Sequence, residues 1–149
     1  MIKIMFVCHG NICRSPMAEF MFKDLVKRAG REAEFEIASS AVSTEEIYRG
    51  EGNPVYPPAK AELSKHGISC EGKRAKLLTK EDGEYYGLFL CMDDSNLRRA
   101  KSILGERNAY KCQKLLELAG EKGDVADPWY TGNFQITYED ILRGIKKLL

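Results

Sequence analysis

The sequence predicts one α/β domain, residues 1–149, in which an open parallel sheet is flanked by helices. Two observations lead to this prediction. Apolar runs of strand length alternate along the chain with segments whose apolar residues recur at helical spacing. A short turn with chemically active side chains, residues 8–16, follows the first apolar run, and sheets of this kind bind ligands beyond the carboxyl ends of their strands. A chain of 149 residues is long enough to bury one substantial core.

The first two elements are a buried strand over residues 3–7 and a helix that ends near residue 29. Ser15 is a suitable N-cap for this helix, and Pro16 suits its first position. Apolar residues then recur near the helical period, at Met17, Phe20, Met21, Leu25 and Ala29. Gly30 follows as a C-terminal stop.

The middle of the chain combines short elements with one long loop. A strand is predicted over residues 35–39, and a loop rich in Ser, Glu and Gly follows over residues 40–56. Loops of this length in compact domains are often functional. A helix begins near Pro57 or Pro58 and stops at Gly67, and a basic connection follows at residues 73–76. A capping box at residues 79–82 then opens a short helix.

The last part of the chain continues the alternation. We predict a strand over residues 86–92, a helix from Asp93 through Leu104, a short fourth strand over residues 109–113 and a loop at residues 127–130. The final helix is capped by residues 137–140, beginning with Thr137, and carries apolar residues on one side: Ile141, Leu142, Ile145, Leu148 and Leu149. Strands that alternate with helices imply right-handed crossovers within a parallel sheet.

Composition excludes several classes of partner. The formal net charge of +1 gives no electrostatic footprint for nucleic acid or an anionic membrane. No apolar run approaches the ~20 residues of a transmembrane helix. The chain enters its first strand at once, without the features of a signal peptide. The five cysteines are odd in number and form no Cys-x-x-Cys pair, which argues against a disulfide scaffold or a metal site. We expect a cytoplasmic monomer.

The turn after the first strand has the composition of an anion-binding loop. Cys8 and Arg14 lie at its two ends with five residues between them. Such a loop can curl so that its backbone N–H groups point inward, and the following helix adds its positive N-terminus. Arg14 would give two planar donors to the bound anion. Cys8 would lie in this positive field, which favours a nucleophilic thiolate. The alternative is a glycine-containing turn with one buried cysteine by chance.

Chemistry on a phosphate ester also needs a proton donor for the leaving oxygen. Asp127 is the best candidate, because Pro128 holds it in a fixed turn. Trp129 and Tyr130 follow at once and would wall a slot for a flat ring; alternatively, these aromatic side chains pack on the core. Asp93 lies at the carboxyl end of the predicted strand 86–92, the edge of the sheet where a site belongs.

Four segments together resemble the low-molecular-weight protein tyrosine phosphatases. They are residues 8–16 (CHGNICRSP), 66–68 (HGI), 91–96 (CMDDSN) and 127–130 (DPWY), and they run in order along essentially the whole chain. The resemblance implies a four-stranded parallel sheet flanked by helices. It also implies hydrolysis of phosphomonoesters without a metal or another cofactor, on a phosphotyrosine-containing protein or a small aryl phosphate.

The resemblance also assigns roles to residues at matching positions. Cys8 is the nucleophile, Arg14 the phosphate clamp and Asp127 the general acid. The phosphate-binding loop comprises His9, Gly10, Asn11, Ile12, Cys13, Arg14 and Ser15, and Ser15 also donates to the Cys8 thiolate. Asn11, together with Ser39 and His66, braces this loop through hydrogen bonds, and Asp93 supports the same network. Cys13 forms a reversible disulfide with Cys8 in this family.

One departure from the family concerns the loop at residues 43–52, which is longer than in many relatives. That loop usually supplies an aromatic side chain facing the substrate ring. Tyr48 is the candidate here, with Ile47 and Tyr56 as alternatives, and it would join Trp129 and Tyr130 around the ring.

Four other functions remain open on the same sequence. Protein arginine phosphatases share the fold and loop but typically have Thr at the position of Ile12 and a weaker aromatic pair after Asp-Pro. Thioredoxin-coupled arsenate reductases need two further cysteines on a mobile segment, a pattern that Cys70 and Cys91 do not match. A binding module without turnover would not need Cys8, Arg14 and Asp127 together, and a phosphocarrier would not need the arginine.

Overall fold

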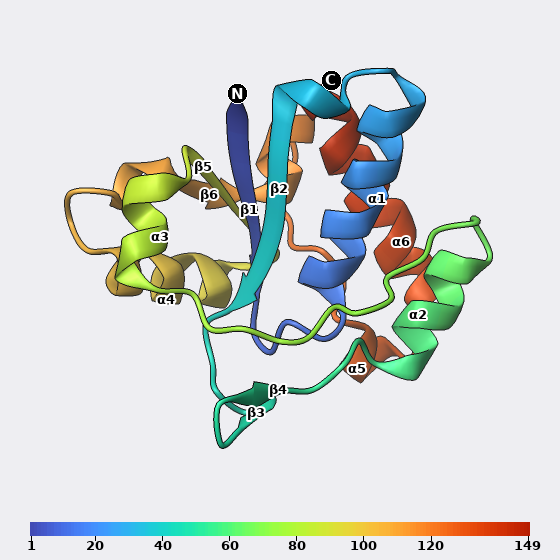
Figure 1. The fold of residues 1–149 in the computed structure, drawn as a ribbon, viewed down its shortest axis with the longest axis horizontal. Helices are drawn as coiled ribbons and strands as arrows, with labels where there is room; N and C mark the ends of the chain where they lie inside the picture. Colours follow the sequence, from blue (N-terminus) through green and yellow to red (C-terminus); the bar gives the residue numbers. More distant parts are fainter.

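The computed structural model describes all residues, 1–149, and confirms an open parallel sheet with helices on both faces (Figure 1). The sheet has the order β2-β1-β5-β6, and every neighbouring pair is parallel. Its strands are β1 (Ile2–Cys8), β2 (Phe35–Ala41), β5 (Leu88–Cys91) and β6 (Cys112–Lys114). The helices are α1 (Arg14–Arg28), α2 (Pro57–Ser64), α3 (Lys80–Tyr85), α4 (Asp94–Leu104), α5 (Pro128–Thr131) and α6 (Phe134–Ile145).

Shorter elements occupy the connections. The long loop contains a small antiparallel hairpin of β3 (Ile47–Tyr48) and β4 (Glu51–Gly52). Single 3₁₀ turns cover Glu32–Glu34, Ala109–Lys111, Leu115–Ala119 and Lys146–Leu148.

Strand β1 is the centre of the molecule and is buried on both faces. Ile4 and Phe6 face one apolar cluster, which includes residues of α1, α2 and α6, whereas Met5 and Val7 face a second cluster with residues of α4. All four side chains are fully buried. This two-sided burial explains why β1 is continuously apolar from Ile4 to Cys8 and does not alternate with polar residues there. In Figure 1, α1, α2 and α6 accordingly lie on one side of the sheet and α3 and α4 on the other.

The order of the strands creates a binding edge. From β1 the chain crosses through α1 to β2 on one side, while β5 pairs with β1 on the other side. The strand order therefore reverses between β1 and β5, the place where open sheets bind ligands. The loop after β1 and Asp93 after β5 both lie at this edge.

The first helix begins two residues earlier than expected. Cys13 occupies the N-cap position in place of Ser15, and its carbonyl accepts the first helical bond, from the Met17 N–H, at 3.0 Å. Pro16 is tolerated because the first N–H groups of a helix have no intrahelical partner. As a result Arg14 and Ser15 belong to the first turn of α1 and point their side chains into the site.

Two elements near the C-terminus also differ from expectation. Thr137 does not cap the last helix: Asn133 does, by accepting from the Ile136 N–H at 3.1 Å, and the Thr137 hydroxyl instead donates to the Ala126 carbonyl at 2.8 Å. The predicted loop at residues 127–130 is the short helix α5, with Asp127 as its N-cap. The capping box that starts α3 at Thr79 is confirmed.

Other boundaries move by a few residues. Strand β2 extends two residues beyond the expected end, and β5 is shorter than predicted at both ends. Strand β6 begins at Cys112 because residues 109–111 form a 3₁₀ turn. Helix α2 ends at Ser64.

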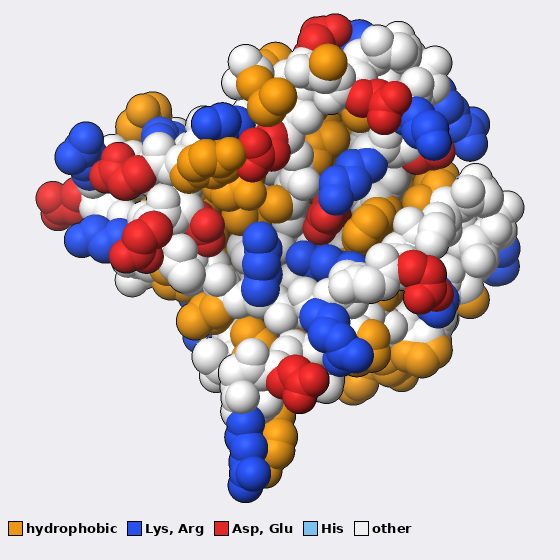
Figure 2. Space-filling view, viewed as in Figure 1, with side chains coloured by type: hydrophobic (Ala, Val, Ile, Leu, Met, Phe, Trp, Pro, Cys, Tyr) orange, Lys and Arg blue, Asp and Glu red, His pale blue; other side chains and the backbone are white.

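The surface carries mixed charges. On the face seen in Figure 2, basic and acidic side chains are interspersed, and the formal net charge is +1. None of the helices combines the length and the apolar character needed to cross a membrane.

Candidate active site

The loop between β1 and α1 wraps around the sulfur of Cys8. Asn11 adopts a left-handed conformation with φ of 59°, which turns the backbone inward and makes a nest for an anion. The Asn11 N–H donates to the Cys8 Sγ at 3.3 Å, and the Ser15 hydroxyl lies 2.9 Å from the same sulfur. Cys8 itself is only 3% exposed. These contacts hold the sulfur at the floor of the nest.

A cavity of about 560 Å³ opens above this loop and brings together segments that are far apart in the sequence. Its lining residues are Cys8, His9, Gly10, Ile12, Cys13 and Arg14 of the loop, Glu45 and Glu46, then Asp93, Ser95 and Asn96, and finally Asp127, Trp129 and Tyr130. The three residues predicted to carry the chemistry, Cys8, Arg14 and Asp127, therefore face one space.

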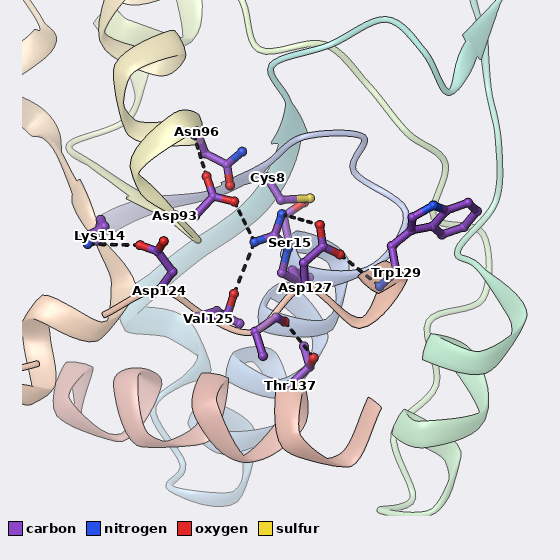
Figure 3. A network of polar contacts seen from close by, with 12 residues as sticks. Cys8, Ser15, Asp93, Asn96, Lys114, Asp124, Val125, Asp127, Trp129 and Thr137 are labelled. Atoms are coloured by element: carbon purple, nitrogen blue, oxygen red, sulfur yellow. Dashed lines mark hydrogen bonds and ion pairs between the residues drawn. The ribbon is translucent and has the colours of Figure 1, made fainter. Parts of the chain in front are cut away.

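Arg14 is buried and held on three sides. Its Nη1 donates to Asp93 Oδ2 at 2.9 Å and to the Val125 carbonyl at 3.3 Å, while its Nη2 donates to Asp127 Oδ2 at 3.4 Å (Figure 3). Burial alone would lower the pKa of Arg14, but the negative charges of Cys8, Asp127 and Asp93 outweigh it and raise that pKa. The guanidinium is thus a permanent, fixed cation beside the sulfur.

Asp93 and Asp127 hold Arg14 in the same way from two sides. The Oδ1 atom of Asp93 caps α4 by accepting from the Asn96 N–H at 2.7 Å, and the Oδ1 atom of Asp127 caps α5 by accepting from the Trp129 N–H at 3.0 Å. Each carboxylate therefore uses one oxygen to begin a helix and directs the other to the guanidinium. This explains why both acids occur at the N-cap position of a helix.

A buried polar network supports the left-handed turn at Asn11. Its Nδ2 donates to the hydroxyls of Ser15 at 2.7 Å and Ser39 at 2.9 Å, and its Oδ1 accepts from the Lys76 N–H at 3.1 Å. Asn11 and Ser39, two of the residues expected to brace the loop, are therefore bonded to each other in the structure.

Two residues that sequence reasoning missed extend this network. The Ser39 hydroxyl donates to Glu19 Oε1 at 2.6 Å, and the Lys73 ammonium lies 3.4 Å from the same oxygen. Glu19 is four residues after Ser15 and so lies on the same face of α1, a spacing that could have indicated it. Burial lowers the pKa of Lys73, and the charge of Glu19 opposes this effect.

His66 does not reach the loop, contrary to the expectation that it helps to brace it. Its Nε2 lies 3.3 Å from Glu62 Oε2, and its ring stacks on Tyr138 with centroids 3.8 Å apart. His66 lies one turn beyond Glu62 at the end of α2, so its short side chain is committed to packing α2 against α6.

The aromatic wall is only partly as predicted. Trp129 and Tyr130 line the cavity and are 63% and 86% exposed, and Tyr56 supports Trp129 from behind with ring centroids 5.2 Å apart. Tyr48 does not line the cavity, because the β3–β4 hairpin carries it away, and it is 71% exposed. From this loop Glu45 and Glu46 line the cavity instead.

Cys13 is buried in the same loop as Cys8. Burial, together with the negative charges of Cys8 and Asp127, raises the pKa of the Cys13 thiol to about 12. At neutral pH this thiol is therefore protonated and does not compete with Cys8. All five cysteines are free thiols in the structure.

Replacing Asn11 with alanine is expected to lower the free energy of unfolding by about 3 kcal/mol, since three hydrogen bonds are lost and a residue with a Cβ must adopt positive φ without asparagine's local bonding. Urea denaturation measures this loss. Asn11→Gly is the matched control, since it loses the same bonds and tolerates positive φ; it should be about 1 kcal/mol more stable than the alanine variant. A loss below about 1 kcal/mol for both variants would contradict a supporting role for the network.

A cysteine in an anion nest, a clamped arginine and a carboxylate across one cavity define a cysteine-based phosphatase on an α/β sheet. The family model for low molecular weight phosphotyrosine protein phosphatase matches residues 3–149. The low molecular weight protein-tyrosine-phosphatase YfkJ of Bacillus subtilis is 35% identical over 151 residues, which cover 100% of this chain and 94% of that protein. The low molecular weight phosphotyrosine protein phosphatase of Gallus gallus is 39% identical over 155 residues, which cover 98% of this chain and 92% of that protein.

Solved structures give the same result. The crystal structure of YfkJ superimposes with a TM-score of 0.92 at 34% identity, covering 99% of this chain and 92% of that one. A YwlE arginine phosphatase variant with a phosphorylated active-site serine gives a TM-score of 0.85 at 30% identity. The match covers 99% of this chain and 93% of that one. The protein belongs to the low molecular weight phosphotyrosine protein phosphatase family and is an enzyme of that class.

Proposed function

We propose that this phosphatase hydrolyses phosphotyrosine in proteins, or small aryl phosphates, through a phosphocysteine intermediate and without a metal. The observation that carries the proposal is the convergence of Cys8, Arg14 and Asp127 on one cavity. In that arrangement positioning and electrostatic stabilisation, supplied by the loop N–H groups and the arginine, do most of the catalysis.

The proposed reaction has two steps. The Cys8 thiolate attacks phosphorus, the bond from phosphorus to the tyrosyl oxygen breaks, and Asp127 gives its proton to that oxygen. The Asp127 carboxylate then takes a proton from water, whose oxygen attacks phosphorus. The phosphorus–sulfur bond breaks, phosphate leaves and the thiolate is restored. Asp93 and Ser15 support these steps by fixing Arg14 and by donating to the sulfur.

The exposed rings of Trp129 and Tyr130 support an aromatic substrate, since they leave flat apolar surface beside the nest. A second candidate substrate is phosphoarginine. The negative charges of Glu45 and Glu46 in the same cavity favour it, since a guanidinium group is positive. Carboxylates at this position would pair with a guanidinium leaving group. The structural similarity to the YwlE arginine phosphatase also supports phosphoarginine as a candidate substrate.

Phosphate release from matched phosphotyrosine, phosphoserine and phosphoarginine peptides, at mildly acid pH with EDTA, tests both candidates. We expect phosphotyrosine to be preferred by about tenfold or more in kcat/KM, because the aromatic surface discriminates among substrates. A preference for phosphoarginine would assign the specificity to the glutamates instead. Release of no more than one phosphate per protein would contradict turnover, and loss of activity only in EDTA would contradict a metal-free reaction.

Cys13 is proposed as the redox partner of Cys8. Its position in the same loop supports this role. Peroxide would oxidise the Cys8 thiolate to a sulfenic acid, and the Cys13 sulfur would then form a reversible disulfide with Cys8 as water leaves.

A further inference from the structure

Lys114 is a buried lysine that the proposed reaction does not use. It is the last residue of β6, and its side chain is only 9% exposed. Its ammonium contacts three oxygens: the Lys122 carbonyl at 2.6 Å, Asp124 Oδ1 at 3.0 Å and Asp94 Oδ1 at 3.2 Å. Burial would lower the pKa of Lys114, but these two carboxylates outweigh it and raise that pKa, so the side chain is a cation at neutral pH.

Two of these contacts lie on the segment that leads to Asp127. Residues 121–127 contain no helix or strand, so their position depends on individual contacts. Lys114 holds the start of the segment at residues 122 and 124. Further along, the Val125 N–H donates to the Met92 carbonyl at 2.8 Å and the Ala126 N–H to Asp140 Oδ2 at 2.9 Å. Figure 3 shows Lys114 and Asp124 on the opposite side of Val125 from Asp127.

We propose that Lys114 is a positioning residue for the proton donor Asp127, acting through the segment at residues 122–127. The inference rests on the proposed role of Asp127. Without the ammonium, the carboxylates of Asp124 and Asp94 would face each other across the space that one Nζ now fills, and their repulsion would push the segment outward. A displacement near 1 Å at a reacting group is enough to lower a rate by up to about a hundredfold.

The leaving group separates this role from a merely structural one. A phenol with a pKa near that of tyrosine, ~10, leaves slowly without a proton, whereas a dinitrophenol leaves readily as its anion. A misplaced proton donor therefore harms the first substrate alone, but a general loss of structure harms both. The value of kcat/KM is the right measure, since it covers all steps through the release of the phenol.

The experiment compares kcat/KM for phenyl phosphate and 2,4-dinitrophenyl phosphate. We expect Lys114→Met to lose about tenfold on phenyl phosphate and less than about twofold on the dinitrophenyl ester. Lys114→Arg keeps the positive charge, so its kcat/KM on phenyl phosphate should be close to that of the parent protein. An equal loss on both substrates, or no loss on either, would overturn the proposal.

Asp124 and Asp94 both contact the Lys114 ammonium, so substitutions of these two residues form a matched pair. The pair also tests the proposal if Lys114→Met does not fold. Asp124→Asn weakens the contact on the segment and should reproduce the selective loss, whereas Asp94→Asn removes a carboxylate of α4 and should leave both rates near wild type. The reverse pattern would contradict the inference.

Asp127→Asn, measured alongside, separates failure of this inference from failure of the proposed function. If Asp127→Asn shows the selective loss and Lys114→Met does not, only the role of Lys114 is wrong. If Asp127→Asn affects both substrates equally, the proton-donor role fails and this inference fails with it.

Discussion

Cys8→Ser is expected to lower phosphate release about 10⁴-fold or more while phosphotyrosine peptides still bind. A serine hydroxyl at this position is far less nucleophilic than a thiolate. An enzyme that loses its nucleophile loses most of its rate enhancement, because the catalytic residues act as a unit. The N–H groups of the nest and Arg14 remain, so the anion still has its donors. Single-turnover phosphate release and peptide calorimetry, on the same preparation, measure the two quantities.

Cys70→Ser is the matched control, because it makes the same exchange in a buried thiol that does not line the cavity. It should retain turnover close to that of the parent protein. Sustained turnover by the Cys8 variant would refute the covalent intermediate, and loss of peptide binding would show that the sulfur itself shapes the anion site.

Arg14→Lys is expected to lower kcat/KM about 10³-fold. A single ammonium cannot replace a planar guanidinium that holds Asp93, Val125 and Asp127 while presenting donors to phosphate. Each donor that stabilises the transition state is worth about 10²–10³ in rate, so the loss of a planar pair has a large effect. Steady-state kinetics, together with competitive inhibition by inorganic phosphate, reports both catalysis and anion binding.

The control for this substitution is Arg28→Lys on the same helix. Arg28 forms an exposed ion pair with Asp24 in the last turn of α1, where an arginine and a lysine are nearly equivalent. It should leave kcat/KM and phosphate inhibition unchanged. An Arg14→Lys variant within threefold of the parent would show that the planar geometry of the guanidinium is not needed.

Much of the fold and the centre of the site are predictable because their signals are local. A buried parallel strand such as β1 is an apolar run in any context, and its end is marked by the glycine and polar residues of the next turn. Cys8 and Arg14 lie within one loop, so their spacing alone indicates an anion site. Asp127 was a candidate because Pro128 was expected to hold it in a fixed turn, although the segment predicted as a loop is the short helix α5.

The exact starts of helices were less predictable. Ser15 and Thr137 are good N-caps by residue type, yet both hydroxyls are used by partners from other segments, at Cys8 and Ala126. Cys13 and Asn133 take the cap positions instead. The residue type therefore indicates which side chains can cap a helix, but tertiary contacts determine which of several neighbouring residues occupies the N-cap position.

The sequence by itself therefore determined the α/β class and indicated an anion loop with Cys8 and Arg14, since both depend on neighbours along the chain, and it offered Asp127 as the candidate proton donor. Only the tertiary structure decided which distant side chains complete the site. It placed Lys73 in the network in place of His66, Glu45 and Glu46 in the cavity in place of Tyr48, and Lys114 against Asp124 in the segment that leads to Asp127. The physical reason is that these contacts depend on how strands and loops pack and on the reach of individual side chains, and neither is encoded in local spacing.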